Sequence, residues 1–174
     1  MTPWQLAKSA SEHAEQTALF CFLAKAEQIG FELAIDPKSW QVPVKLASQP
    51  KPIPELRWLH AIPNGGSRGD TDKSRAIEGG KMKAEGVKTG VHDICWPFSV
   101  RENKSDKYSG LNYCGLYIEM KRRTLKRAND PHHGCSNEQK DFGQFVHDNG
   151  FYVTVCYGWE EAANVIRDYY RGTL

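Results

Sequence analysis

The chain has 174 residues, of which 40% are hydrophobic and 25% are charged, and its formal net charge is +2. This length suits one domain with a buried core, and this composition excludes a disordered or fibrous protein. A net charge so close to zero favours no class of partner, so function has to be read from local patterns.

Targeting and redox signals are weak in this chain. The five cysteines are spread from Cys21 to Cys156 without paired spacing, and they predict no disulfide framework. No apolar run reaches the length of a membrane-spanning helix, and the first residues lack the hydrophobic centre of a signal peptide. We therefore expect a cytoplasmic protein that does not enter a membrane.

The N-terminal third predicts one helix and then an irregular segment. Apolar residues recur at helical spacing over about residues 9–29, with Ser9 or Ser11 as the N-cap and Gly30 at the end. Five prolines follow within residues 31–54. So many prolines exclude a long regular element, and we expect an excursion with at most a short strand at residues 41–46.

The middle of the chain predicts strands around one helix. Residues 56–62 read as a strand that a turn at residues 63–66 ends, and a polar helix follows over Asp72 to Glu85. Residues 91–96 and 115–123 contain two further strands. A long polar hairpin from Pro97 to Cys114 joins them.

The C-terminal third carries the strongest local signals. Ser136 and Gln139 fit a capping box that opens a helix, and Gly150 closes that helix. A β-branched and aromatic strand at residues 151–157 and a helix at residues 160–170 complete the chain. The order of elements predicts an α/β fold, with a mixed central sheet flanked by helices.

The strand at residues 115–123 carries the chemistry. In an extended chain Leu116, Ile118 and Met120 face one side, whereas Glu119 and Lys121 face the other. The two charged residues are two positions apart, hence roughly 6 to 7 Å along a strand. They are close enough to act on one metal-bound water.

A second carboxylate lies in the strand before it. If Asp93 came beside Glu119, the two would form a hard oxygen site for a divalent cation. This pattern predicts metal-assisted hydrolysis. In the alternative reading, Asp93 caps a strand while Glu119 and Lys121 lie on a solvated face. A central strand argues against that alternative, because an unpaired buried charge is costly there.

Five sequence blocks in order also resemble a known family, the virus-type replication-repair nuclease (VRR-NUC) domain of the PD-(D/E)xK nuclease superfamily. The blocks are Ala61-Ile62-Pro63-Asn64-Gly65-Gly66, residues 81–93 (KMKAEGVKTGVHD), Gly115-Leu116-Tyr117-Ile118-Glu119-Met120-Lys121-Arg122, Ser136-Asn137-Glu138-Gln139 and Val155-Cys156-Tyr157-Gly158-Trp159. The resemblance covers most of residues 56–171. It implies that residues 1–174 form a single nuclease domain with a restriction-endonuclease-like core.

The resemblance implies a site and a cofactor. In the family pattern Asp93 and Glu119 bind Mg²⁺ or Mn²⁺ together with the main-chain carbonyl of Met120. Lys121 then orients or deprotonates the attacking water. Gln139 either points into this site or only completes the capping box.

The sequence leaves open the roles of two further residues near the site, Glu12 and His92. Glu12 matches an acidic residue that superfamily members contribute to the metal shell, with its neighbour Glu15 as a weaker candidate, although helical glutamates often only face water. His92 stands where the family usually has proline. We expect a local backbone change there without loss of activity, or else a contact from His92 to the metal.

Basic residues around these blocks are candidates for contacts with DNA phosphates. They are Lys81, Lys83, Lys88, Arg122 and Arg123. In the alternative reading they only keep a helix face soluble. His132, His133 and Cys135 lack the four ligands at paired spacings of a structural zinc site, so we predict no zinc there.

Two functions remain at this stage. The first is a divalent-metal-dependent DNA endonuclease, acting on branched, flapped or junction DNA in replication, repair or recombination. Stand-alone domains of this type occur in phages, which would place the protein in the host-cell cytoplasm. The second is a catalytically silent nucleic-acid-binding or adaptor protein with the same fold. Because one small site cuts one strand, a homodimer is a further expectation.

Overall fold

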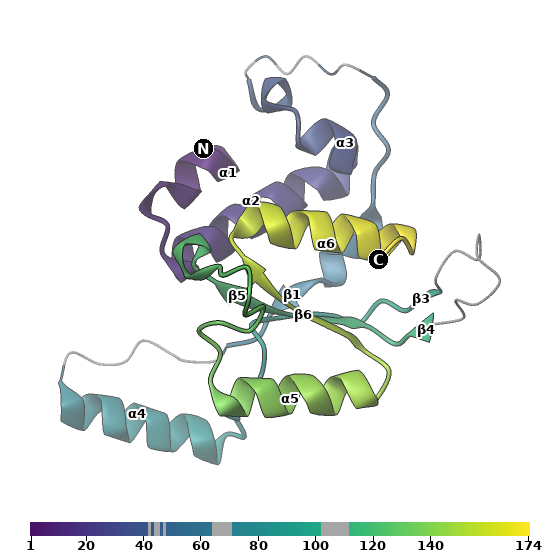
Figure 1. Ribbon diagram of the computed structural model, residues 1–174. Coiled ribbons are helices and arrows are strands. Elements are labelled where there is room, and N and C mark those ends of the chain that lie inside the picture. The colour runs from purple at the N-terminus through teal and green to yellow at the C-terminus, as the bar shows by residue number, and fades with distance from the viewer. Residues whose placement is uncertain (42, 44–45, 47, 64–70, 102–111) are drawn as a thin grey trace.

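A computed structural model describes the chain except for residues 42, 44–45, 47, 64–70 and 102–111 (Figure 1). Its helices are α1 (Pro3–Leu6), α2 (Glu12–Ile29), α3 (Phe31–Ala34), α4 (Asp72–Ala84), α5 (Asn137–Asp148) and α6 (Trp159–Arg171). Its strands are β1 (His60–Ala61), β2 (Ile94–Trp96), β3 (Val100–Arg101), β4 (Asn112–Tyr113), β5 (Leu116–Lys121) and β6 (Tyr152–Tyr157). Short 3₁₀ turns are η1 (Ala7–Ser9), η2 (Pro37–Trp40), η3 (Pro54–Trp58) and η4 (Arg123–Leu125).

The central sheet has the strand order β1-β2-β5-β6. The first two pairs are antiparallel and β5–β6 is parallel, so the sheet is mixed as expected. Helices α2 and α6 cover one face and α5 covers the other, while α4 projects away from the sheet at the lower left (Figure 1). Strands β3 and β4 form a separate ribbon. Among the described residues, no helix is both long and apolar enough to cross a bilayer.

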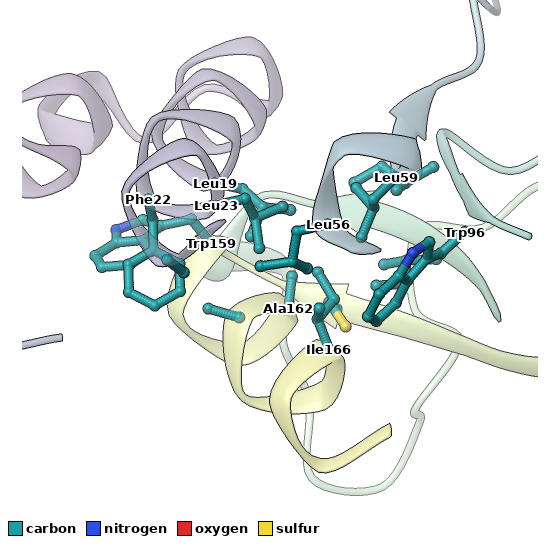
Figure 2. Close-up of a cluster of buried hydrophobic side chains, with 14 of the residues drawn as sticks. Leu19, Phe22, Leu23, Leu56, Leu59, Trp96, Trp159, Ala162 and Ile166 are labelled. Carbon is teal, nitrogen blue, oxygen red and sulfur yellow. The ribbon is translucent and has the colours of Figure 1, made fainter. Parts of the chain in front are cut away.

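The hydrophobic core lies between the sheet and the α2–α6 layer (Figure 2). Strand β5 buries its alternating apolar residues there, and helix α6 buries Ala162 and Ile166 against it. Trp159 packs against Phe22 of α2 with 5.6 Å between ring centroids. This layer holds β5 in the middle of the molecule.

The predicted strand at residues 56–62 is wrong over most of its length. Residues Pro54–Trp58 form η3, and only His60–Ala61 pair as β1. Pro54 starts the turn because its φ is already fixed near a helical value. Leu56 and Leu59 are both buried in the core, which a helical turn allows and an alternating strand does not.

The predicted N-terminal helix begins later than expected. Ser11, and not Ser9, is the N-cap of α2, and its hydroxyl accepts a hydrogen bond from the Ala14 amide at 3.1 Å. Ala10 separates η1 from α2 with a φ of 51°, which a continuing helix cannot accommodate. The short helix α1 was not predicted.

The segment 31–54 is more regular than predicted near its start, where it forms α3 and η2. Gln41, Pro43 and Leu46 are not in a strand, and the rest of the strand predicted at residues 41–46 lies outside the described residues. The turn at residues 63–66 lies mostly outside them as well. Helix α4 and the Ser136 capping box are confirmed, although α5 ends at Asp148, two residues before Gly150.

Candidate active site

The strand register brings Asp93 opposite Glu119. Ile94 pairs with Ile118 in the antiparallel β2–β5 ladder, and Asp93 directly precedes β2, so extending this register by one residue sets it opposite Glu119. Residues directly opposite each other in such a pair project to the same face. Asp93 is fixed by two contacts: its Oδ2 accepts a hydrogen bond from the Met120 amide at 2.8 Å, and its carbonyl accepts one from the Ile62 amide at 2.7 Å.

Glu119 is a buried carboxylate with one unused oxygen. Its residue is 1% exposed, and its Oε1 accepts hydrogen bonds from Lys121 Nζ at 2.7 Å and from Gln139 Nε2. Its Oε2 is buried and has no hydrogen-bond partner among the described residues. Burial and the nearby charge of Asp93 raise the pKa of Glu119 to about 7. A hard divalent cation fits this donor set, since it would pair both carboxylates and supply the missing contact.

Lys121 is held against Glu119 as a cation. The residue is 7% exposed, and its Nζ also donates to Gln139 Oε1 at 3.2 Å. Burial alone would lower the pKa of Lys121, but the hydrogen bond and the charge of Glu119 outweigh it and raise that pKa. An ammonium in this place can donate to a phosphate oxygen or a water, and it is poorly suited to act as a base.

Gln139 fulfils both of the roles that the sequence left open. Its backbone amide donates a hydrogen bond to Ser136 Oγ at 3.3 Å, and the Ser136 backbone amide donates to Gln139 Oε1 at 2.9 Å. The same side chain contacts Glu119 and Lys121. The helix cap therefore also positions an amide group beside Glu119 and Lys121.

His92, two residues before β2, anchors α5 to the start of that strand. It is 3% exposed, its Nε2 donates to the Gln139 carbonyl at 3.1 Å, and its ring packs edge-on against Phe142 at 5.3 Å. Burial lowers the pKa of His92 and keeps the imidazole neutral. Gly90, two residues earlier, has a φ of 86° and passes so close to the Glu138 carbonyl that a Cβ would lie 2.5 Å from it.

The two acidic candidates on α2 differ. Glu12 is exposed, and its charge raises the pKa of both Glu119 and Lys121, so it lies on the side of α2 that faces the site. Glu15 is fully buried and accepts hydrogen bonds from Arg123 Nε at 2.7 Å and from the Trp159 amide at 2.9 Å. Glu15 therefore clamps the end of β5 to the start of α6.

This clamp escaped the sequence analysis. Glu15 and Arg123 are 108 residues apart, and neither belongs to a local pattern that predicts a pair. The Arg123 side chain is 44% exposed, and its guanidinium lies 3.9 Å from Glu160 as well. Its role as a phosphate contact remains a prediction.

The other basic candidates are on the protein surface. Lys81, Lys83, Lys88 and Arg122 are exposed, the first two on the projecting helix α4. Across the part of the chain that the structure describes, no three His, Cys, Asp or Glu side chains gather closely enough to hold a metal ion. Asp93 and Glu119 are thus the two carboxylates on which a cation here would depend.

No protein-family model matches this chain, and the curated proteins include no match to it. A solved structure described as a VRR_NUC domain protein is similar over 93% of this chain and 89% of its own, with a TM-score of 0.51 and 19% sequence identity. Identity this low establishes the fold alone. The resemblance expected from the sequence is thus confirmed at that level: the chain has the fold of a VRR_NUC domain protein.

Proposed function

We propose that this protein is a divalent-metal-dependent endonuclease that hydrolyses phosphodiester bonds in DNA. The observation that supports it best is the position of Asp93, which directly precedes β2 and falls opposite Glu119 when the β2–β5 register is extended by one residue, with Lys121 hydrogen-bonded to Glu119. These residues match the acidic and lysine positions of the PD-(D/E)xK pattern. A buried carboxylate oxygen without a partner is the kind of group that a cation would use.

Each residue has a distinct role in this proposal. Asp93, Glu119 and the Met120 carbonyl hold Mg²⁺ or Mn²⁺, which when bound neutralises phosphate charge and lowers the pKa of a water ligand. Lys121 directs its ammonium at the oxygens that gain charge in the transition state and orients the attacking water. Gln139 keeps Lys121 and Glu119 in place. Glu12, which is exposed on α2, adds negative charge near Lys121 and the bound cation.

The substrate is proposed to be DNA because of the exposed basic residues around the site. Arg122 directly follows the site strand, and Lys88 lies between α4 and Asp93. Such residues bind phosphates without reading sequence. A preference for branched, flapped or junction DNA is part of the same proposal. A panel of labelled hairpin, flap, single-strand and four-way junction substrates tests that preference.

Plasmid nicking tests the activity. We expect nicking with Mg²⁺ or Mn²⁺ and none with EDTA, and we expect Lys121→Ala to cut at least about 100-fold more slowly, as loss of a transition-state donor does. Lys8→Ala is the matched control, because it removes an exposed lysine on η1 and should leave cutting unchanged. If wild type and Lys121→Ala both shift DNA in a gel but neither cuts it, the adaptor function is correct.

We further propose that the protein acts as a homodimer, since one site of this kind cuts a single strand. Light scattering coupled to size-exclusion chromatography measures the mass directly. A monomer mass, both with and without a junction substrate, would rule out this part of the proposal.

A further inference from the structure

A cleft of about 390 Å³ lies beside the candidate active site, between α5 and the edge strand β6. Its lining includes His92 and Gln139. Gln139 contacts both Glu119 and Lys121, so the cleft adjoins the site. The metal site as proposed makes no use of this space.

The floor of the cleft is apolar. Val155 of β6 is in register with Glu119 of β5, and Val153 is in register with Tyr117. Neighbouring residues on parallel strands face the same side, so the floor is one strand spacing, about 4.8 Å, from the strand that bears Glu119. A group bound on this floor would lie next to whatever is bound at the carboxylates.

The wall of the cleft changes in character along α5. Lys140 follows Gln139 and provides a cation at the end near the site. Further along the helix, the lining includes Gly143 and the polar side chains of Gln144 and His147. Both side chains contact Asp148: Gln144 Nε2 donates to Asp148 Oδ1 at 2.8 Å, and His147 Nδ1 lies 3.5 Å from the same oxygen. The far end therefore offers a neutral amide and an imidazole above an apolar floor.

We infer that this cleft receives the base of a nucleotide next to the scissile phosphate, an inference that rests on the proposed function. Cations near the site suit the phosphates, valine side chains suit the faces of a base, and amide and imidazole groups suit its edges. The volume lies at the lower end of the roughly 300 to 1,000 Å³ of small-molecule pockets, which is room for one nucleoside but not for a duplex.

This assignment restricts the substrate class. A base reaches such a cleft only when it leaves the stack, and unstacking costs least at a mismatch, a flap or a single-stranded junction arm. The cleft thus gives a physical reason for cutting beside an unpaired nucleotide. Phosphate contacts alone would give no such preference.

Binding to DNA with single abasic nucleotides tests the inference without cleavage. Labelled flap oligonucleotides, each with one tetrahydrofuran nucleotide at a different position, are titrated with wild-type protein in EDTA. We expect one position at which loss of the base weakens binding about 10-fold, or roughly 1.4 kcal/mol. A 2-aminopurine at that position should gain fluorescence on binding, because it leaves the stack.

A cleft-filling variant connects this effect to the cleft. Gln144→Trp adds a ring from the α5 side, and we expect it to bind intact DNA about 10-fold more weakly (roughly 1.4 kcal/mol) and to lose the abasic effect. Asp141→Trp is the matched control, since Asp141 is on the same helix but does not line the cleft. Val153→Phe fills the cleft from β6 and serves if Gln144→Trp fails to fold.

The outcomes separate this inference from the proposed function. A flat abasic scan, or filled variants that bind like Asp141→Trp, would overturn the inference even if the protein cuts DNA. A position-specific base effect in a protein that never cuts would support the cleft and reject the nuclease.

Discussion

The two faces of strand β5 are both largely buried but differ in chemistry. On the α2–α6 face, Ile118 and Met120 enter a close-packed apolar core. On the α5 face, Glu119 and Lys121 are almost as inaccessible, and they are charged. The first face gains stability from its burial, and the second tolerates burial only because each charge is paired. Burial alone therefore does not distinguish the candidate site; the carboxylate oxygen of Glu119 that has no hydrogen-bond partner among the described residues does.

The aromatic residues show the same division. On the core face Trp159, Phe22 and their neighbours pack on one another. On the α5 face, Tyr117 contacts Phe142 and Phe151, each at 5.3 Å between ring centroids. Tyr117 is two residues before Glu119 on the same face of β5. This small aromatic cluster attaches α5 to β5, so Gln139 can reach Glu119. The first two experiments below each change one face and leave the other intact, and the later ones compare the site with its surroundings.

The largest effect is expected from neighbouring residues on opposite faces. Glu119→Gln keeps the shape but removes the charge that would hold a cation, and we expect cleavage to fall at least about 1,000-fold. Ile118→Val should cost about 1 kcal/mol of unfolding free energy and leave cleavage nearly unchanged. Initial cutting rates and urea melts measure the two effects. Rapid cutting by Glu119→Gln would reject the site.

The core face should give the largest loss of stability. Ile166 is fully buried, so Ile166→Ala leaves a cavity and should cost about 3 kcal/mol. For a domain of this size that corresponds to a fall in Tm of about 6 to 12 °C. Calorimetry measures the shift, and cutting should persist well below the new Tm. A Tm within a degree of wild type would show that α6 is not packed on this face.

Metal binding should stabilise the protein in a pH-dependent way. The pKa of Glu119 is about 7 in the folded protein, above its unfolded value, so its contribution to stability is lost as pH rises from about 4.5 through 7. Mn²⁺ needs the ionised carboxylate and should restore stability mainly above pH 7, by about 2.7 kcal/mol at 100 times its Kd. Thermal melts in EDTA and in Mn²⁺ at pH 5.5 and 8 test this. Equal Mn²⁺ shifts at both pH values would contradict it.

Neighbouring arginines should separate stability from DNA binding. Arg123→Ala removes the charged donors from buried Glu15 and should cost about 2 kcal/mol. Arg122→Ala should leave the free energy of unfolding unchanged, because that side chain is exposed, and weaken DNA binding. Denaturation and gel-shift titrations compare them. If the two variants have the same free energy of unfolding, the ion pair between Glu15 and Arg123 has no stabilising role.

The smallest effect is expected on the projecting helix. Lys81→Ala and Lys83→Ala should each weaken DNA binding only a few-fold. Each should also reduce the slope of log K against the logarithm of the salt concentration by about one. The free energy of unfolding should not change, since both side chains are exposed. Titrations at several salt concentrations measure the slope. An unchanged slope would assign these lysines to solubility alone.

Local signals in the sequence predicted much of the fold, including the strand that carries the candidate site. The alternation of β5, the Ser136 capping box and the end of α2 at Gly30 are each encoded within a few residues. The same reasoning failed at residues 56–62, where a proline start and two buried leucines produced a helical turn. An apolar run that short fits either period, and only its packing against α2 decides between them.

The sequence by itself determined which residue types stand on β5 and at the start of α5, because periodicity and caps depend on near neighbours. Only the tertiary structure decided that Asp93 lies opposite Glu119, that Gln139 reaches the same carboxylate, and that Glu15 pairs with Arg123. Those contacts join residues far apart in the chain. Their geometry comes from strand register and helix packing, which no local pattern specifies.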